Sequence, residues 1–441
     1  MNRNLRKLIS VISFILVSVC VFAQDGAFNA YSPYSVYGIG DILKDGNAFT
    51  KTMGGVGIAT RNRRYINYLN PAAITARDSL AFMADVSLYQ DSRLFRQNDL
   101  KTSSGTANIQ DLILTFPIYR SSAMMVGIMP YSSTGFGYIS SYNDDNLMSQ
   151  MGDITYSATG HGALYQAFAA GAVTFWDKVS IGAQAIYCFG NTKKSYYETI
   201  SDASYLGSNN GYNLILKGFT GKFGVQFSQD IAGGNLTVGA TYKMATRLKG
   251  SVEGYRYSSG SAATDTLYHS MSSIEEEGVS LAGEMGFGIN YGKKNRWMAE
   301  INYSRSDWTH SGMDKAEGFA GNLIPGSGSS IFSTSVSQGV NAGFEIIPNS
   351  GDIRYYFNRC AYRAGAYYKK DYFKLDGHDI TSYGITLGMS MPVFRWYNAL
   401  TLGIDLGRRG SVADNLIRET YIKFNIGVNI FDIWFQKPQY N

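Results

Sequence analysis

The residue types that most often catalyse reactions or bind metals are few in this chain, and they are not grouped. Each of the four histidines falls in or next to a predicted loop; they are His161, His269, His310 and His378. No His and Cys spacing suits a zinc site, and no Gly-x-Ser-x-Gly turn is present to expose a nucleophilic serine. Serine and aspartate are abundant, but no grouping stands out as a nucleophile with its base.

Two further motifs give no better candidate. Gly38 and Gly40 are not part of a Gly-x-x-x-x-Gly-Lys phosphate-binding loop. The run from Glu275 to Glu277 has the charge to attract calcium, but we interpret it as a solvated acidic loop. We therefore expect no catalytic residue, no metal site and no cofactor.

The first 23 residues have the layout of a secretory signal peptide. Three basic residues near the start precede a mostly apolar run over residues 8–22, and the small residue Ala23 offers a cleavage site before Gln24. An uncleaved membrane anchor is the first alternative, although the run is short for a spanning helix. A lipoprotein attached through Cys20 is the second, although Val19 is not the small residue expected before such a cysteine. We predict a signal peptide over residues 1–23 and an exported chain.

The composition of the remaining chain is unusual for a soluble protein. The sequence has 49 Gly, 33 Tyr and 24 Phe, while charged residues make up only 17%. The predicted signal carries three of the 39 basic residues, which leaves 36 against 34 acidic ones, so no nucleic-acid partner is implied. No linker, low-complexity tract or further apolar run of helix-spanning length is present. An exported chain of this kind suggests a β-barrel.

The strongest structural signal is alternation with a period of two. In residues 417–430 one set is apolar and the other polar or small: Ile422, Phe424, Ile426, Val428 and Ile430 against Lys423, Asn425, Gly427 and Asn429. A helix of period 3.6 would mix the two sets. In the same way Glu300 and Asn302 alternate with Ile301 and Tyr303. These segments are therefore predicted to be strands with one apolar face.

Segment length separates a membrane barrel from a soluble sandwich. A sandwich also alternates, but its strands have about five or six residues, whereas about 9–11 residues are needed to cross the hydrocarbon layer. Most segments here reach that length, and there are fourteen: 79–94, 108–119, 122–135, 163–176, 178–194, 212–229, 235–257, 278–291, 296–308, 333–347, 360–374, 378–391, 398–408 and 417–430. The sequence predicts an all-β, 14-stranded antiparallel transmembrane β-barrel over residues 79–441.

The links between these segments alternate in length. Short links such as 120–121, 177–178 and 233–234 alternate with longer ones such as 136–161 and 309–332. Bacterial outer-membrane barrels have short periplasmic turns and longer outer loops. The pattern therefore predicts a multi-pass barrel in the cell outer membrane, with both termini on the periplasmic side.

Residues 24–78 do not alternate and are rich in Gly and Pro. They contain a glycine-rich segment with Gly54, Gly55 and Gly57, and later the triplet Asn70, Pro71 and Ala72. Such a composition favours compact irregular backbone. We predict an N-terminal hatch, or plug, inside the barrel.

The order of these features resembles the FadL/TodX family of outer-membrane transporters for hydrophobic compounds. The resemblance rests on Gly-Gly-x-Gly-Ile-Ala at residues 54–59 and on Asn-Pro-Ala at residues 70–72, followed by the first strand. Residues 160–166, 187–190 and 419–435 resemble a less characterised branch of FadL-like barrels. In the family, a short hatch sits inside a 14-stranded barrel, and a kinked third strand opens the wall toward lipid.

The resemblance implies a function and a place for the ligand to leave. It implies passive uptake of small hydrophobic molecules, such as long-chain fatty acids, with lateral release through the barrel wall. The partners would be outer-membrane lipid and the hydrophobic ligand, which would pass an apolar pocket above the plug. Some FadL-like barrels are instead subunits or shuttles of secretion or outer-membrane assembly complexes, with protein partners. The sequence does not separate these alternatives; a barrel-embedded enzyme is a third.

One proline offers independent evidence for an opening. Pro130, between Met129 and Tyr131, lies well inside the third predicted strand. Proline cannot donate to a strand ladder, so it marks an edge or a bulge. We expect a local break here and a lateral opening at residues 129–131; the alternative is a proline tolerated near the outer rim. We also hypothesise that the triplet 70–72 packs against this break.

Overall fold

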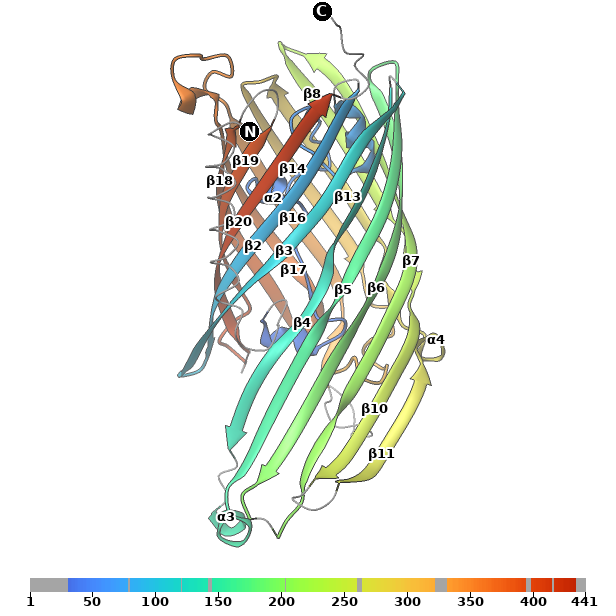
Figure 1. The fold of residues 1–441 in the computed structure, drawn as a ribbon, viewed down its shortest axis with the longest axis vertical. Coiled ribbons are helices and arrows are strands. Elements are labelled where there is room, and N and C mark those ends of the chain that lie inside the picture. Colours follow the sequence, from blue (N-terminus) through green and yellow to red (C-terminus); the bar gives the residue numbers. More distant parts are fainter. Residues whose placement is uncertain are drawn as a thin grey trace, which may run out of the picture.

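The computed structural model describes residues 31–77, 80–119, 121–141, 145–202, 204–259, 264–321, 331–393, 398–414 and 416–433. Their strands form a closed antiparallel β-barrel with 14 wall positions (Figure 1). The first six positions are β2 (Ala81–Gln97), β3 (Leu100–Tyr119), β4 (Ser122–Ser141), β5 (Ile154–Phe175), β6 (Val179–Ile200) and β7 (Gly207–Ile231). The predicted signal peptide and residues 434–441 lie outside the described residues.

Some of the remaining positions are built from two successive strands. The seventh is β8 (Gly234–Lys243) and β10 (Lys249–Ser259), the eighth is β11 (Thr264–Ser273) and β13 (Glu284–Lys293), the ninth is β14 (Trp297–Asp307), and the tenth is β15 (Phe332–Thr334) and β16 (Val336–Ile346). The last four are β17 (Ala361–Leu375), β18 (His378–Pro392), β19 (Ala399–Arg409) and β20 (Arg418–Ile433). The barrel closes because β20 pairs with β2 from Arg418 opposite Arg96 to Ile433 opposite Ala81. A short separate ladder joins β9 (Thr246–Arg247) to β12 (Ser280–Leu281).

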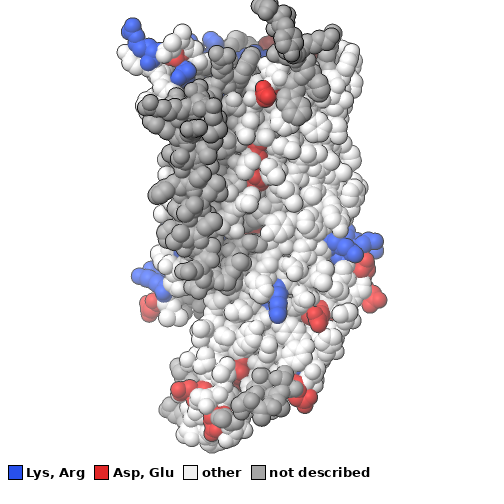
Figure 2. All heavy atoms as spheres, in the orientation of Figure 1, with Lys and Arg blue, Asp and Glu red and all other residues white. Residues whose placement is uncertain are grey.

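Burial in the wall is the reverse of that in a soluble protein. On β14, Ile301 is 62% exposed, while its neighbours Glu300 and Asn302 are 1% and 4% exposed. Apolar side chains therefore point outward and polar side chains point into the lumen. Figure 2 shows charged side chains gathered mainly toward the two ends of the barrel, with a mostly uncharged band between them. This pattern is that of a barrel surrounded by lipid. Among the described residues, no helix has the length and apolarity that would let it span a membrane.

The fourteen predicted strands are confirmed, but several are longer than predicted. The segment 136–161, predicted as a loop, contains the ends of β4 and β5 around α3 (Asp145–Met151). The segment 258–277, also predicted as a loop, contains the whole of β11 and α4 (Ile274–Glu277). His161 and His269 therefore lie within strands. These extensions mix aromatic, small and polar residues, so the apolar alternation that identified the wall is absent from them.

The extensions give the barrel two unequal ends. At the end where β2 begins and β20 ends, most connections are short, the one from β16 to β17 being the longest described; we call this the short-turn end. At the other end, β4 to β7, β10 and β11 continue well beyond the rest of the wall (Figure 1); we call this the long-loop end. A one-turn η3 (Tyr356–Arg359) precedes β17 at the short-turn end.

Residues 31–77 fold inside the barrel, and we call them the plug. They contain η1 (Pro33–Val36), β1 (Asp41–Ile42), α2 (Ala48–Lys51) and η2 (Pro71–Ala76). Most of their side chains are buried, among them Ile39, Phe49 and Met53 at 2% exposure or less. The plug runs from the long-loop half of the lumen to the short-turn end, where the chain enters β2.

Candidate functional site

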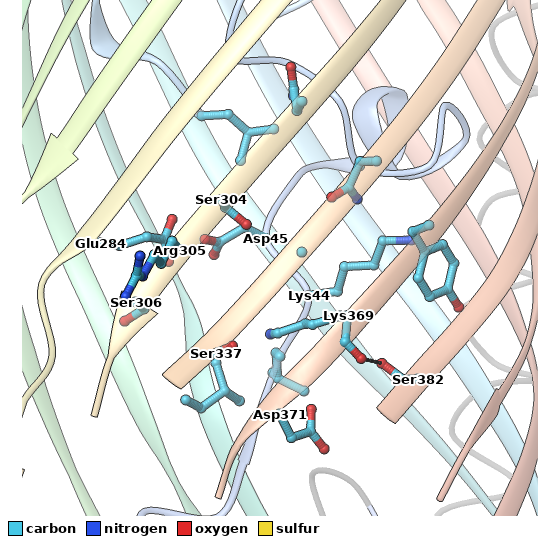
Figure 3. Close-up of a pocket in the computed structure, with 18 of the residues that line it drawn as sticks. Lys44, Asp45, Glu284, Ser304, Arg305, Ser306, Ser337, Lys369, Asp371 and Ser382 are labelled. Atoms are coloured by element: carbon cyan, nitrogen blue, oxygen red, sulfur yellow. Dashed lines mark hydrogen bonds between the residues drawn. The ribbon is translucent and has the colours of Figure 1, made fainter. Parts of the chain in front are cut away.

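The lumen beside the plug contains a charged cavity of about 190 Å³. Lys44 and Asp45 of the plug and Lys369 of β17 line it, together with Glu284 of β13 and Ser304 of β14 (Figure 3). Lys222 and Lys243, opposite each other on β7 and β8, line it as well. This cavity therefore differs from the apolar pocket expected above the plug, because the wall strands turn polar faces inward and bring charged groups into its lining.

A buried ionic cluster holds the plug to the wall next to this cavity. Asp41 of β1 accepts from Arg409 of β19 at 2.9 Å and lies 3.4 Å from Arg93 of β2. Arg93 also pairs with Glu419 at 2.9 Å, and Arg409 pairs with Asp371 at 2.6 Å. All five side chains are at least about nine-tenths buried. The cluster therefore joins one plug carboxylate to four strands of the barrel.

The ladder between β3 and β4 is incomplete. It runs from the short-turn end only as far as the pair Leu112 and Ile128. Beyond that pair, residues 100–111 of β3 are paired with β2 alone, and β4 continues beside β5. In the β4–β5 ladder the register shifts between Pro130 and Ser132. Figure 1 shows the lower part of β3 diverging from β4, with η1 visible between them.

The plug takes the place of β3 along the free edge of β4. β1 pairs with β4 through Asp41 opposite Ser133 and Ile42 opposite Ser132. The Leu43 amide donates to the Tyr131 carbonyl at 3.0 Å. Nearer the long-loop end, the Ser32 amide donates to Gly135, and the Tyr31 hydroxyl donates to Gly137. Residues 31–43 therefore supply hydrogen-bonding partners that a regular barrel would take from the adjacent strand.

The three residues around the proline lie where the wall and the plug meet. Met129 and Tyr131 are 4% and 8% exposed. Met129 and Pro130 line a second, small cavity of about 30 Å³, together with Gln110 of β3 and Lys51 of the plug. Plug residues 43–45 line both cavities, and Tyr131 also lines the main one, so the break borders the main cavity.

The hypothesis that the triplet 70–72 packs against this break is wrong in its contacts. The Asn70 amide donates to the carbonyl of Ile58 at 2.8 Å and to that of Val225 on β7 at 3.2 Å. A Cβ on Gly182 of β6 would overlap Pro71 and Ala72. The triplet therefore packs on β6 and β7, and Asn70 caps η2 by accepting from the Ala72 amide. The resemblance singled out this asparagine, but the sequence held no signal for the strands it faces.

The glycine-rich segment lies against the opposite wall. The Gly54 amide donates to the Thr386 hydroxyl at 2.8 Å, and its carbonyl accepts from Asn341. Gly54 and Gly55 have φ of 72° and 85°, which other residues rarely adopt. Gly57 lies close to Leu69 within the plug. These glycines therefore allow the plug backbone to turn while it touches the wall.

Glu300 is a plug-binding residue that the sequence analysis did not single out. Its carboxylate accepts from the Ala59 amide at 3.0 Å, from the Thr60 hydroxyl, and from Asn290 at 3.1 Å. The sequence did contain a sign of this role, because Glu300 is a charged residue at an inward-facing position in a stretch of regular alternation on β14.

We expect Glu300→Ala to loosen the plug between residues 58 and 60. The change leaves buried donors without an acceptor, and each such group costs about 1–3 kcal/mol. Hydrogen exchange of purified protein should show faster exchange of the Ala59 amide and a lower unfolding temperature. Glu277→Ala, at the exposed α4, is the control. Equal protection of Ala59 in both variants would contradict the assigned role.

The described residues contain no group of three or more His, Cys, Asp or Glu side chains placed to hold a metal ion.

Comparison with curated proteins gave no match. Solved structures do match over nearly their whole length. The toluene transporter TbuX of Ralstonia pickettii has a TM-score of 0.58 at 14% identity and covers 88% of this chain and 98% of its own.

Two more structures give the same result. The toluene transporter TodX of Pseudomonas putida has a TM-score of 0.56 at 12% identity, covering 90% of this chain and all of its own. A FadL homologue of Pseudomonas aeruginosa has a TM-score of 0.55 at 11% identity, with the same coverage. At identities this low, the structural likeness establishes a shared fold and nothing more. The closed wall and the enclosed N-terminal segment therefore define a plugged, 14-stranded β-barrel of the FadL type. A family model described as BamG matches residues 5–441, so the chain belongs to the BamG family.

Proposed function

We propose that this protein is an outer-membrane channel for passive uptake of small hydrophobic or amphipathic molecules, which leave the lumen sideways between β3 and β4. The observation that carries the proposal is the end of the β3–β4 ladder at Leu112 and Ile128. Backbone groups exposed to lipid are costly, so a wall tolerates such a break only where other polar groups or water cover it. Plug residues 31–43 supply that cover along β4. The similar toluene transporters make a hydrophobic cargo the natural class.

The charged side chains next to the break indicate which class of hydrophobic molecule passes best. A molecule leaving the lumen crosses the larger charged cavity, and it then meets Lys44 and Lys51 of the plug in the small cavity before it passes Met129 and Pro130. A plain hydrocarbon gains nothing from these groups. A long-chain fatty acid places a carboxylate near the lysines while its chain stays in the wall. We therefore propose that such amphiphiles pass more readily than toluene.

A reversible cross-link across the break tests this route. Gln110→Cys and Met129→Cys, made where the native Cys188 and Cys360 are replaced by alanine, put two thiols beside the small cavity. Joining them with a cleavable bismaleimide should reduce uptake of radiolabelled oleate to the level of cells lacking the protein. Cleaving the linker should restore uptake.

The control pair is Leu114→Cys with Val126→Cys. These residues face each other in the closed part of the same ladder, so a bridge there should leave uptake unchanged. Equal uptake before and after bridging the test pair would exclude the break as the path. Failure of the unmodified protein to import either oleate or toluene would exclude transport itself.

A subunit of a secretion or outer-membrane assembly complex is the second candidate. The strand β11 favours it, because β10 is its one ladder partner within the described residues, and exposed strand edges readily pair with other chains. Mild solubilisation and purification of the tagged protein would distinguish the two. A stoichiometric protein partner supports the complex, and co-purified lipid alone supports transport.

A further inference from the structure

The six strands that extend the long-loop end carry a row of tyrosines on their lumen side. Register places Tyr138 of β4, Tyr196 of β6 and Tyr268 of β11 along one line across the sheet. The positions between them, at the same level, are Ala158, Asn210 and Arg256. Tyr156 of β5 lies one level further out, and its ring stacks on that of Tyr196 at 5.7 Å. We call Tyr138, Tyr156, Tyr196 and Tyr268 the tyrosine face.

Small residues beneath the rings let them lie close to the sheet. A Cβ on Gly160 would overlap the ring of Phe136, which stacks on Tyr138 at 6.2 Å. A Cβ on Gly254 would lie 3.3 Å from the ring of Tyr268. Tyr138 is 51% exposed. The face therefore presents aromatic surface to solvent at the end of the molecule, although a soluble sheet would normally bury it.

Polar side chains alternate with these rings, and one of their hydrogen-bond acceptors has no donor in the described part of the chain. Ser208 donates to Glu198 at 3.1 Å and accepts from the Asn210 amide at 3.1 Å. Asn210 is 3% exposed, and its Oδ1 has no hydrogen-bond partner among the described residues. A buried acceptor without a donor costs free energy. A ligand hydroxyl at this point would supply the missing donor.

We propose that the tyrosine face binds a saccharide chain. The C–H faces of a pyranose ring are apolar and slightly positive, so they stack on the negative faces of aromatic rings. The hydroxyls around its edge need donors and acceptors between those rings, which Asn210, Glu198 and Arg256 provide. An unsubstituted hydrocarbon would leave Asn210 unpaired. The inference does not depend on transport, because the face lies beyond the lumen cavity and the break in the wall.

Two sources of saccharide are possible in the orientation that short periplasmic turns indicate. The long-loop end then faces the outside of the cell, where it meets both soluble glycans and the polysaccharide of the cell's own surface. The binding chemistry is the same for both. The experiment therefore uses maltohexaose, cellohexaose and laminarihexaose as soluble probes, and polysaccharide released from the outer membrane of the expressing strain as the other arm.

Calorimetric titration of the full-length protein measures binding, in a detergent without a sugar headgroup. We expect one probe to bind, and Tyr196→Ala and Tyr156→Ala each to weaken binding by about tenfold, the upper end of what one aromatic contact contributes. Tyr196→Phe should retain most of the affinity, and Asn210→Leu should lose it. Binding of the released polysaccharide alone would identify a ligand of the cell's own surface, and binding of a hexasaccharide an external glycan.

Tyr197→Ala is the matched control. It removes the same side chain one residue further along β6, on the opposite face of the sheet, near Tyr255. An equal loss of affinity in Tyr196→Ala and Tyr197→Ala would overturn the proposal, as would the absence of binding to every probe by the unmodified protein. Retention of the unfolding temperature in each variant shows that the loss comes from the contact and not from the fold.

Discussion

Arg409→Ala should destabilise the protein by about 3–5 kcal/mol, the usual cost of removing one partner from a buried ion pair. The change leaves Asp371 without its 2.6 Å partner and removes the shorter of the two arginine contacts of Asp41. Both carboxylates are about nine-tenths buried, so solvation compensates only partly for the lost partner and the folded state is destabilised. The unfolding temperature measured by circular dichroism in detergent should therefore fall markedly.

Arg408→Ala is the matched control, because Arg408 is the next residue on β19 and is exposed on the outer face. It should change the unfolding temperature little. The double variant Arg409→Ala with Asp371→Ala should be more stable than the sum of the single changes predicts, because it also removes the carboxylate that Arg409→Ala leaves without a partner. Strict additivity would show that the two groups do not interact as described.

Gly365→Val should displace the plug from the wall. A Cβ at this position on β17 would overlap the backbone of Met53 and Gly54. Relieving the overlap breaks the 2.8 Å bond from the Gly54 amide to Thr386. Overpacking and the lost bond each cost about 1–3 kcal/mol. In planar bilayers we expect a higher and noisier conductance than in the unmodified protein, and in solution a plug that proteases cleave.

Gly365→Ala should give a weaker form of the same change, because one methyl group needs a smaller shift. Gly171→Val is the control, since a Cβ on Gly171 meets no atom within 4 Å. It introduces the same branched side chain into a strand without touching the plug. A conductance that is unchanged in Gly365→Val would mean that the plug does not limit passage.

The sequence was a good guide to the wall because lipid imposes a strict rule on it. Every second residue of a wall strand faces hydrocarbon and must be apolar, as in Ile422 to Ile430, so strand positions can be found by counting. The rule stops at the membrane boundary. Beyond it, Tyr156 and Glu198 face one side of the sheet and Tyr197 faces the other. Water tolerates all three side chains, so neither face needs to be apolar and no alternation marks the strand. The extensions were therefore predicted as loops.

The contacts of the plug could not be predicted in the same way. Asn70 was singled out because the triplet 70–72 resembles a motif of the FadL/TodX family. Its position against β7 depends on how residues 31–69 fold in three dimensions, and local sequence does not carry that information. The main cavity differs from the expected pocket for a different reason: the resemblance suggested an apolar cavity, while the alternation around Glu300 already required polar side chains inside.

The ionic cluster also constrains how the molecule assembles. The wall closes where the first strand, β2, pairs with the last, β20. Asp41 contacts Arg93 on β2 and Arg409 on β19, and Arg93 reaches Glu419 on β20. One carboxylate thus binds side chains on both sides of the closing seam. The seated plug therefore holds the two sides of the seam together, and we expect seating of residues 31–77 and closure of the wall to stabilise each other.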